Sequence, residues 1–125
     1  MLVAVAEDDP DIAFLLETLL SDNGYRLVMT DNGPDVLAAC RDRRPDVLLL
    51  DRTMPGDLDG MDVLRELRAD PTFDGMPVVL LTARSAQAEI DAALAAGATA
   101  YLVKPFALSA LLGLLADLLP ADDSS

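Results

Sequence analysis

Carboxylates follow two short aliphatic runs of the 125-residue sequence, at positions where they could bind a cation. Glu7 and Asp8 come directly after the run Leu2–Ala6, and Asp51 comes directly after the run Val47–Leu50. Carboxylates that lie close together repel one another by roughly 4 kcal/mol per pair at an effective dielectric constant of about 20. Such a cluster therefore needs protons or a cation, and oxygen ligands without His or Cys favour Mg²⁺ or a similar ion.

A hydroxyl group and an ammonium group follow two further aliphatic runs. Thr82 comes after Val78–Leu81, and Lys104 comes after Tyr101–Val103. Each residue alone has an ordinary structural explanation, because acids after strands often cap helices and a Lys before Pro is usually a surface residue. Their joint occurrence is informative, since the carboxyl ends of parallel strands meet at one edge of a sheet, where ligands bind in α/β proteins.

Segments with helical periodicity separate the aliphatic runs. Apolar residues recur at helical spacing between Ile12 and Leu20. Asp9 is expected to cap this helix, with Pro10 in its first turn and Gly24 at its end. Because the aliphatic runs are continuous rather than alternating, we expect strands that are covered on both faces.

Similar signals mark the remaining elements. Asp59 and Ser85 are expected to cap two later helices and Gly97 to end the second, whereas Ala107 leaves the last helix without a capping side chain. Strands alternating with helices predict a parallel sheet with helices on both faces. We expect strands at residues 2–6, 25–30, 47–50, 78–81 and 101–103, and helices that begin near residues 10, 33, 59, 85 and 108, the last two ending near 96 and 119.

Composition excludes several classes of function. The formal charge of −13 would repel a nucleic acid backbone, so direct nucleic-acid binding is not expected. No apolar run is long enough to span a bilayer, and the N-terminus lacks the pattern of a signal peptide, so we expect a cytoplasmic protein without membrane contact. The chain has no His, and its single cysteine, Cys40, is interpreted as a buried apolar residue.

Together these segments resemble the receiver domain of bacterial two-component response regulators over nearly the full length of the chain. The resemblance implies a flavodoxin-like, doubly wound α/β fold with five parallel strands in the order 2-1-3-4-5 and five helices. We expect one receiver domain over residues 1–120 and a flexible tail over residues 121–125. The segments that carry the resemblance are Val5–Pro10, Asp46–Asp51, Met54-Pro55, Leu81–Ala83 and Tyr101–Phe106.

The resemblance assigns a phosphoacceptor and a metal site. It implies that Asp51 accepts a phosphoryl group, and that Glu7, Asp8, Asp51 and the backbone carbonyl of Thr53 bind Mg²⁺ or Mn²⁺. Glu7 departs from the family pattern, which usually has Asp at this position, and its side chain is one methylene longer. In this chemistry the carboxylate attacks a phosphohistidine in line and forms an acyl phosphate, with the protein mainly positioning charge.

The resemblance also assigns a phosphoryl-binding pair and a switch. Thr82 and Lys104 correspond to the residues that contact the phosphoryl oxygens, and the Lys104-Pro105 peptide bond is expected to be cis. Thr82 and Tyr101 correspond to the switch residues, which move when the product adds about −1.5 to −2 units of charge. We expect a signalling switch that catalyses only its own phosphorylation and dephosphorylation.

The same resemblance implies the partners. A histidine kinase or a phosphotransfer protein is the expected phosphodonor, and a downstream protein is expected to bind the face formed by residues 85–119, with the chain a monomer or weak dimer. The last helix is rich in Leu, and most of these leucines are expected to pack inward. An apolar partner surface on that helix is the alternative interpretation.

Other classes of protein share parts of this pattern. A flavin-binding protein needs a first loop that cradles a phosphate, and the acidic segment 7–9 has the wrong sign for that. A haloacid-dehalogenase-type phosphatase would have a second Asp at the position of Thr53. A receiver that acts as a phosphorylation-independent interaction module stays open, because Glu7 and a lengthened turn after Met54 are departures at the metal site.

Overall fold

Five aliphatic runs form the strands of one parallel sheet. The order is β2-β1-β3-β4-β5, and every pair of neighbours is parallel, which confirms the predicted fold class and strand order. The computed structural model describes residues 1–119, so the tail predicted over 121–125 lies outside the described residues. The strands are β1 (Leu2–Ala6), β2 (Arg26–Thr30), β3 (Val47–Asp51), β4 (Val78–Thr82) and β5 (Ala100–Val103).

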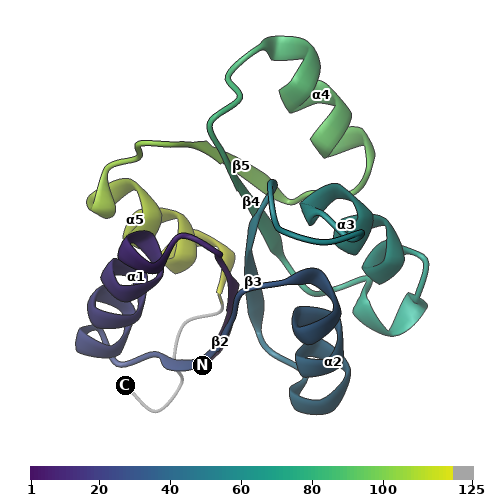
Figure 1. The fold of residues 1–125 in the computed structure, drawn as a ribbon. Coiled ribbons are helices and arrows are strands. Elements are labelled where there is room, and N and C mark those ends of the chain that lie inside the picture. The colour runs from purple at the N-terminus through teal and green to yellow at the C-terminus, as the bar shows by residue number, and fades with distance from the viewer. Residues whose placement is uncertain (120–125) are drawn as a thin grey trace.

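Two layers of helices cover the sheet (Figure 1). One layer contains α1 (Pro10–Asp22) and α5 (Leu108–Leu118), which lie side by side. The other contains α2 (Gly33–Arg43), α3 (Gly60–Arg68) and α4 (Gln87–Ala95), with a short 3₁₀ turn, η1 (Pro71–Phe73), after α3. Within residues 1–119 no helix has both the length and the apolarity needed to cross a bilayer.

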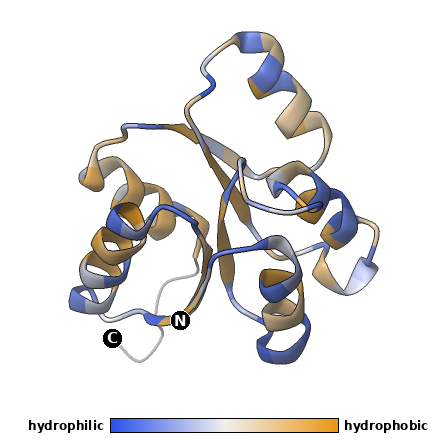
Figure 2. Ribbon diagram, in the orientation of Figure 1, coloured by the Kyte–Doolittle hydropathy of each residue, from blue (hydrophilic) through white to orange (hydrophobic). Residues whose placement is uncertain are grey.

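The core consists of two clusters, one on each face of the sheet. In β3, Leu49 packs toward α1 and α5, whereas Leu48 and Leu50 pack toward α2 and α3. Every residue of β1, β3 and β4 is buried, as predicted from their continuous apolarity, and the strands at the centre of Figure 2 are correspondingly hydrophobic. Burial of each large aliphatic side chain contributes about 1.5–3 kcal/mol, so these strands form a rigid base for the residues that follow them.

Capping side chains fix where α1 and α3 begin, and therefore where the loops after β1 and β3 end. The Asp9 carboxylate accepts hydrogen bonds from the backbone amides that follow it, as predicted, and Gly24 adopts a positive φ of 86° just after α1. Asp59 and Asp62 form a reciprocal capping box at the start of α3, which confirms the cap expected at Asp59. Each cap satisfies amides that would otherwise lack partners.

The predicted cap of α4 is wrong. Ser85 does not cap this helix, because the loop after β4 continues in an extended conformation through Ala86, and the helix begins only at Gln87. Ala86 offers no side-chain acceptor, so α4 starts without a cap. The start of α5 also lacks a side-chain cap, as expected from Ala107.

A few element boundaries differ by one residue from those predicted. Tyr25 was expected in the second strand, but its amide donates to the carbonyl of Leu20 and thus belongs to the turn after α1. The third strand extends to Asp51, and the fifth begins at Ala100 rather than Tyr101. The last helix ends at Leu118, one residue before the expected end. Element ends commonly shift by one or two residues in this way.

Most leucines of the last helix pack inward, which favours the first of the two interpretations. Leu111 and Leu115 are fully buried, and Leu119 just beyond the helix is 7% exposed. Those at positions 108, 112, 114 and 118 are half-buried. The leucines from Leu111 to Leu119 therefore belong to the core cluster on this face of the sheet. Leu108 instead lines an open apolar pocket with Ile12, Leu15 and Phe106.

Candidate functional site

The carboxyl ends of four strands bring the predicted site residues to one edge of the sheet. Glu7 follows β1, Asp51 is the last residue of β3, Thr82 is the last residue of β4, and Lys104 follows β5. The chain leaves β1 toward β2 on one side of it and enters β3 on the other. Glu7 and Asp51 therefore lie at the point where the strand order reverses, which is where α/β sheets bind ligands.

Lys104 connects two of the predicted acids. Its Nζ atom lies 3.0 Å from Oε2 of Glu7 and 3.3 Å from Oδ1 of Asp51, and it donates a hydrogen bond of 3.2 Å to Oε1 of Glu7. The backbone amide of Lys104 donates to the carbonyl of Thr82 at 2.7 Å, which ties the loop after β5 to the end of β4. The Lys104-Pro105 peptide bond is cis, as expected.

The Glu7 side chain is fully buried beneath this ion pair. Its Oε1 atom also accepts a hydrogen bond of 3.2 Å from the amide of Asp9. Its Oε2 atom is buried and makes no hydrogen bond, so the ammonium group of Lys104 is its favourable partner among the described residues. A buried carboxylate oxygen without a hydrogen bond is costly, and further positive charge at this site would stabilise it.

Asp51 is the second buried acid of the site, at 4% exposure. The amide of Thr53 donates to its Oδ1 atom at 3.1 Å and fixes the orientation of the carboxylate. Burial raises the pKa of Asp51, and the neighbouring Glu7 carboxyl group raises it further. Burial would lower the pKa of Lys104, but the hydrogen bond to Glu7 and the charge of Asp51 outweigh it, so the pKa of Lys104 is raised.

Asp8 completes an acidic cluster with Glu7 and Asp51. One carboxylate oxygen from each residue lies within 4.8 Å of the others. Asp8 is exposed, but the solvent that its carboxyl group loses in the pocket raises its pKa, and the neighbouring Asp51 carboxyl group raises this pKa as well. Within residues 1–119, Lys104 is the one basic residue that forms an ion pair with Glu7 or Asp51. All the candidate ligand atoms are carboxylate oxygens, and Oε2 of Glu7 makes no hydrogen bond among the described residues. The cluster therefore fits a hard divalent cation.

The hydroxyl groups of Thr82 and Tyr101 both contact the backbone of Arg84. Thr82 is 2% exposed, and its Oγ1 atom accepts a hydrogen bond of 3.0 Å from the amide of Arg84, so its own proton is left to donate elsewhere. Tyr101 is half-buried, and its hydroxyl donates to the carbonyl of Arg84. The two predicted switch residues are thereby connected through one peptide segment after β4.

One ion-pair network next to the site was missed in the sequence. Arg52 follows Asp51 directly, and its Nη2 atom lies 3.2 Å from Oε2 of Glu89 in α4. Arg84 Nη1 lies 3.3 Å from the other oxygen of Glu89. The side on which Arg52 lies could have been predicted, because side chains alternate between the two faces of a strand. Arg52 is two residues after Leu50, which packs toward the layer that contains α4. Nothing in the sequence indicated that Glu89 is the partner.

Comparison with a family model decides the classification of this arrangement. The family model of the response regulator receiver domain matches residues 3–116. The chain is a response regulator receiver domain. This confirms the predicted family and makes the chain a signalling switch rather than a conventional enzyme. The acidic pocket of Glu7, Asp8 and Asp51 is consistent with a phosphoacceptor aspartate in such a domain.

Individual relatives agree with this classification. The receiver is 42% identical over 128 residues to response regulator MprA of Mycobacterium avium (strain 104), a match that covers 99% of the receiver and 55% of the relative. It is 39% identical over 104 residues to DNA-binding response regulator MtrA of Mycolicibacterium smegmatis, covering 83% of the receiver and 44% of the relative. The receiver thus spans about half the length of the curated relatives it matches.

Solved structures share the fold. The receiver domain of sensor histidine kinase PA1611 from Pseudomonas aeruginosa PAO1, solved with a magnesium ion coordinated in its active site cleft, superposes with a TM-score of 0.85 at 31% identity, covering 94% of the receiver and 95% of that chain. The BeF3-activated N-terminal receiver domain of Klebsiella pneumoniae RstA gives a TM-score of 0.88 at 30% identity, covering 97% and 100%.

Proposed function

We propose that the receiver accepts a phosphoryl group on Asp51 in a reaction that requires Mg²⁺ or Mn²⁺. The observation that carries the proposal is the placement of the buried Asp51 carboxylate, 3.3 Å from the Lys104 ammonium and within 4.8 Å of the Glu7 and Asp8 carboxylates. Such a site combines a nucleophile, a fixed positive charge and oxygen ligands for a cation. These are the parts that phosphoryl transfer needs, since its catalysis is mostly positioning and charge stabilisation.

The acidic residues of the site have two roles in the transfer, binding of the cation and attack on phosphorus. Glu7, Asp8, Asp51 and the carbonyl of Thr53 would hold the cation, which supplies positive charge that offsets the repulsion between carboxylate and phosphoryl group. The oxygen of Asp51 attacks phosphorus in line, so that an acyl phosphate bond forms as the P–N bond of a phosphohistidine breaks. The displaced imidazole leaves as a neutral base after it takes up a proton.

Lys104 and Thr82 stabilise the transferred group. The ammonium group of Lys104 moves little, because it already faces the carboxylate that becomes phosphorylated. The Thr82 hydroxyl gives up its place beside the amide of Arg84 and donates to a phosphoryl oxygen. Tyr101 follows, since its hydroxyl is bound to the carbonyl of Arg84. The charge of the product thereby shifts a two-state loop after β4.

The proposal extends to partners and location. A histidine kinase or a phosphotransfer protein is the phosphodonor, and a downstream protein binds the face of residues 85–119, where Leu94 is 45% exposed. The receiver, formed by residues 1–120, acts in the cytoplasm as a monomer or weak dimer. Its charge of −13 disfavours direct contact with nucleic acid, so any output on DNA would require another segment or protein.

Intact mass spectrometry after treatment with acetyl phosphate and Mg²⁺ tests the function. The receiver should gain the mass of one phosphoryl group, and Asp51→Asn should gain none. Asp57→Asn is the matched control, because this exposed residue lies in the loop after β3 and makes none of the site contacts. An unlabelled wild-type receiver would support the alternative, a phosphorylation-independent interaction module. A label that persists in Asp51→Asn would reassign the acceptor.

A further inference from the structure

Helix α4 is weakly embedded in the described fold. Ala93 is its only fully buried residue, and Leu94 is exposed. Ala86 provides no capping side chain, and no basic residue lies in the last turn. Figure 1 shows α4 standing away from the other helices, beyond the carboxyl ends of the strands. Apolar packing therefore contributes little to the stability of this helix, and its polar contacts contribute a larger share than in the other helices.

Glu89 makes two ion pairs in the first turn of α4. Its Oε2 atom lies 3.2 Å from Nη2 of Arg52, and its Oε1 atom lies 3.3 Å from Nη1 of Arg84. The pair with Arg52 is the better shielded of the two, since the Arg52 side chain is 17% exposed and that of Arg84 is 55% exposed. The Nε atom of Arg52 is buried and makes no hydrogen bond within the described residues. One carboxylate thus joins α4 to two separate loops.

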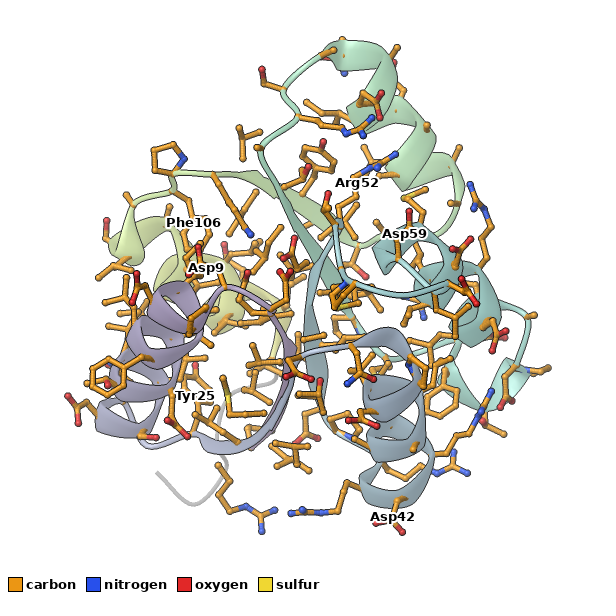
Figure 3. All side chains as sticks on the ribbon, in the orientation of Figure 1. Asp9, Tyr25, Asp42, Arg52, Asp59 and Phe106 are labelled. Atoms are coloured by element: carbon orange, nitrogen blue, oxygen red, sulfur yellow. The ribbon has the colours of Figure 1, made fainter. Side chains whose placement is uncertain are left out.

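Both loops lead directly to the phosphorylation site. Arg52 is the residue after Asp51, and Figure 3 shows it on the α4 side of the loop that follows β3. Arg84 is connected to Thr82, because its amide donates to the Thr82 hydroxyl at 3.0 Å. A change in charge at Asp51 therefore acts on Arg52, which is its neighbour in the chain. A rotation of the Thr82 hydroxyl acts on Arg84 through a single hydrogen bond.

We propose that Glu89 is a positioning residue that holds α4 in the unphosphorylated receiver through Arg52 and Arg84, and that phosphorylation of Asp51 releases it. This proposal rests on the proposed function. The phosphoryl group adds about −1.5 to −2 units of charge next to Arg52 and competes with Glu89 for its guanidinium group. The Thr82 hydroxyl turns toward the phosphoryl oxygens, so the amide of Arg84 loses its acceptor and Arg84 shifts away from α4.

Hydrogen–deuterium exchange of the backbone amides of residues 90–96 measures how strongly Glu89 stabilises α4. In the receiver without phosphodonor, Glu89→Gln should speed their exchange by about two- to fivefold, the factor expected from loss of a partly exposed ion pair. Asp91→Asn is the matched control on the same helix, because within residues 1–119 the Asp91 side chain makes one hydrogen bond, accepted from Gln87 at 2.8 Å, and Asn keeps an acceptor for it. Its exchange should stay within the error of wild type.

The second arm adds beryllofluoride with Mg²⁺ as a mimic of the phosphoryl group. Exchange in α4 should rise in wild type and in Asp91→Asn, but change little in Glu89→Gln, whose helix is already released. A merely structural role for Glu89 would leave the response to beryllofluoride intact in Glu89→Gln, and that result would overturn the proposal. Exchange in untreated Glu89→Gln that equals wild type would overturn it as well.

The two proposals fail in distinguishable ways. A wild-type receiver that takes no phosphoryl group from acetyl phosphate refutes the proposed function, and with it the release of α4 on phosphorylation. The comparison of untreated Glu89→Gln with wild type is independent of phosphorylation, so it still decides whether Glu89 holds the helix. Normal labelling of Asp51 together with unchanged exchange in Glu89→Gln would instead refute the role of Glu89 alone.

Discussion

The Nζ atom of Lys104 lies 3.3 Å from Oδ1 of Asp51, although β4 separates the strands that carry the two residues. The contact is possible because Lys104 follows β5 on a loop whose amide binds the end of β4, which brings the long side chain across to β3. The same ammonium group also pairs with Glu7. Among residues 1–119, the site therefore sets the one positive charge of Lys104 against the carboxylates of Glu7, Asp8 and Asp51. The stability of the fold depends on that charge and on added cations.

Replacing Lys104 with Met should destabilise the metal-free receiver. The carboxylates of Glu7 and Asp51 would stay buried without their counter-ion, so the free energy of unfolding at neutral pH should fall by about 2 kcal/mol. Urea denaturation in the presence of a chelator measures this loss. Millimolar Mg²⁺ should restore part of it by supplying positive charge to the same oxygens. Arg65→Met is the control, because the one ion pair of Arg65 among the described residues is an exposed pair with Asp62.

Replacing Asp51 with Asn should stabilise the metal-free receiver at neutral pH. Burial raises the pKa of Asp51 in the folded state, so the folded state keeps a proton that the unfolded state has already lost. Wild-type stability therefore falls as the pH rises from the ordinary Asp pKa through the raised one. The Tm of Asp51→Asn should exceed that of wild type by about 4 °C, the shift for about 1 kcal/mol in a domain of this size.

That gain should disappear in acid. Below about pH 3 the carboxyl group of Asp51 is protonated in both states, so Asp51→Asn removes no charge there. Calorimetry from neutral pH downward measures the trend. A gain in Tm that is equal at all pH values, or a loss of stability at neutral pH, would contradict a raised pKa as the cause.

Replacing Gly60 with Ala should disturb both stability and the site. An added Cβ would lie 2.6 Å from the Cα atom of Arg52, and the backbone there cannot yield without shifting the residue after Asp51. We expect a loss of about 1–3 kcal/mol and slower labelling by acetyl phosphate. Gly113→Ala is the matched control in α5, because its added Cβ meets no atom within 4 Å. It should gain about 0.5–1 kcal/mol through helix propensity.

Replacing Arg68 with Lys should destabilise the fold without affecting phosphorylation. The guanidinium group donates to the carbonyls of Gly97, Phe73 and Met76 at 2.9, 2.6 and 2.8 Å. Lys cannot reproduce this fan of hydrogen bonds, so we expect a loss of about 2 kcal/mol in denaturant titrations. Labelling at 25 °C should match wild type, because Arg68 binds the segments that precede β4 and β5, away from their carboxyl ends. Markedly slower labelling would show that the two ends of the sheet are coupled.

Much of the site could be predicted from the sequence because it follows from strand ends. Continuous aliphatic runs identified β1, β3 and β4, and Asp51 and Thr82 stand where two of these runs end. Parallel pairing then places them at one edge without any knowledge of side-chain conformations. The cap at Asp59 was predictable for the same reason, since its signal is local.

The features that were missed depend on tertiary contacts. Ser85 is a good capping residue, yet the loop after β4 stays extended past it, so the local signal was misleading. The pairing of Arg52 with Glu89 depends on how α4 crosses the end of β3, which no local pattern specifies. The complete burial of Glu7 could not be predicted either, because an acid after a strand is usually exposed.

The position of the phosphoryl group can be measured by peptide mass spectrometry. After treatment with acetyl phosphate and Mg²⁺, borohydride reduces an acyl phosphate to an alcohol, and peptide mass spectrometry then identifies the aspartate that has become homoserine. We expect conversion at Asp51 alone, which should be lost when a chelator removes the cation and be strongly reduced in Lys104→Met. Conversion at Asp8 or at another carboxylate, or equal conversion at Asp51 with the cation removed, would contradict the proposed function.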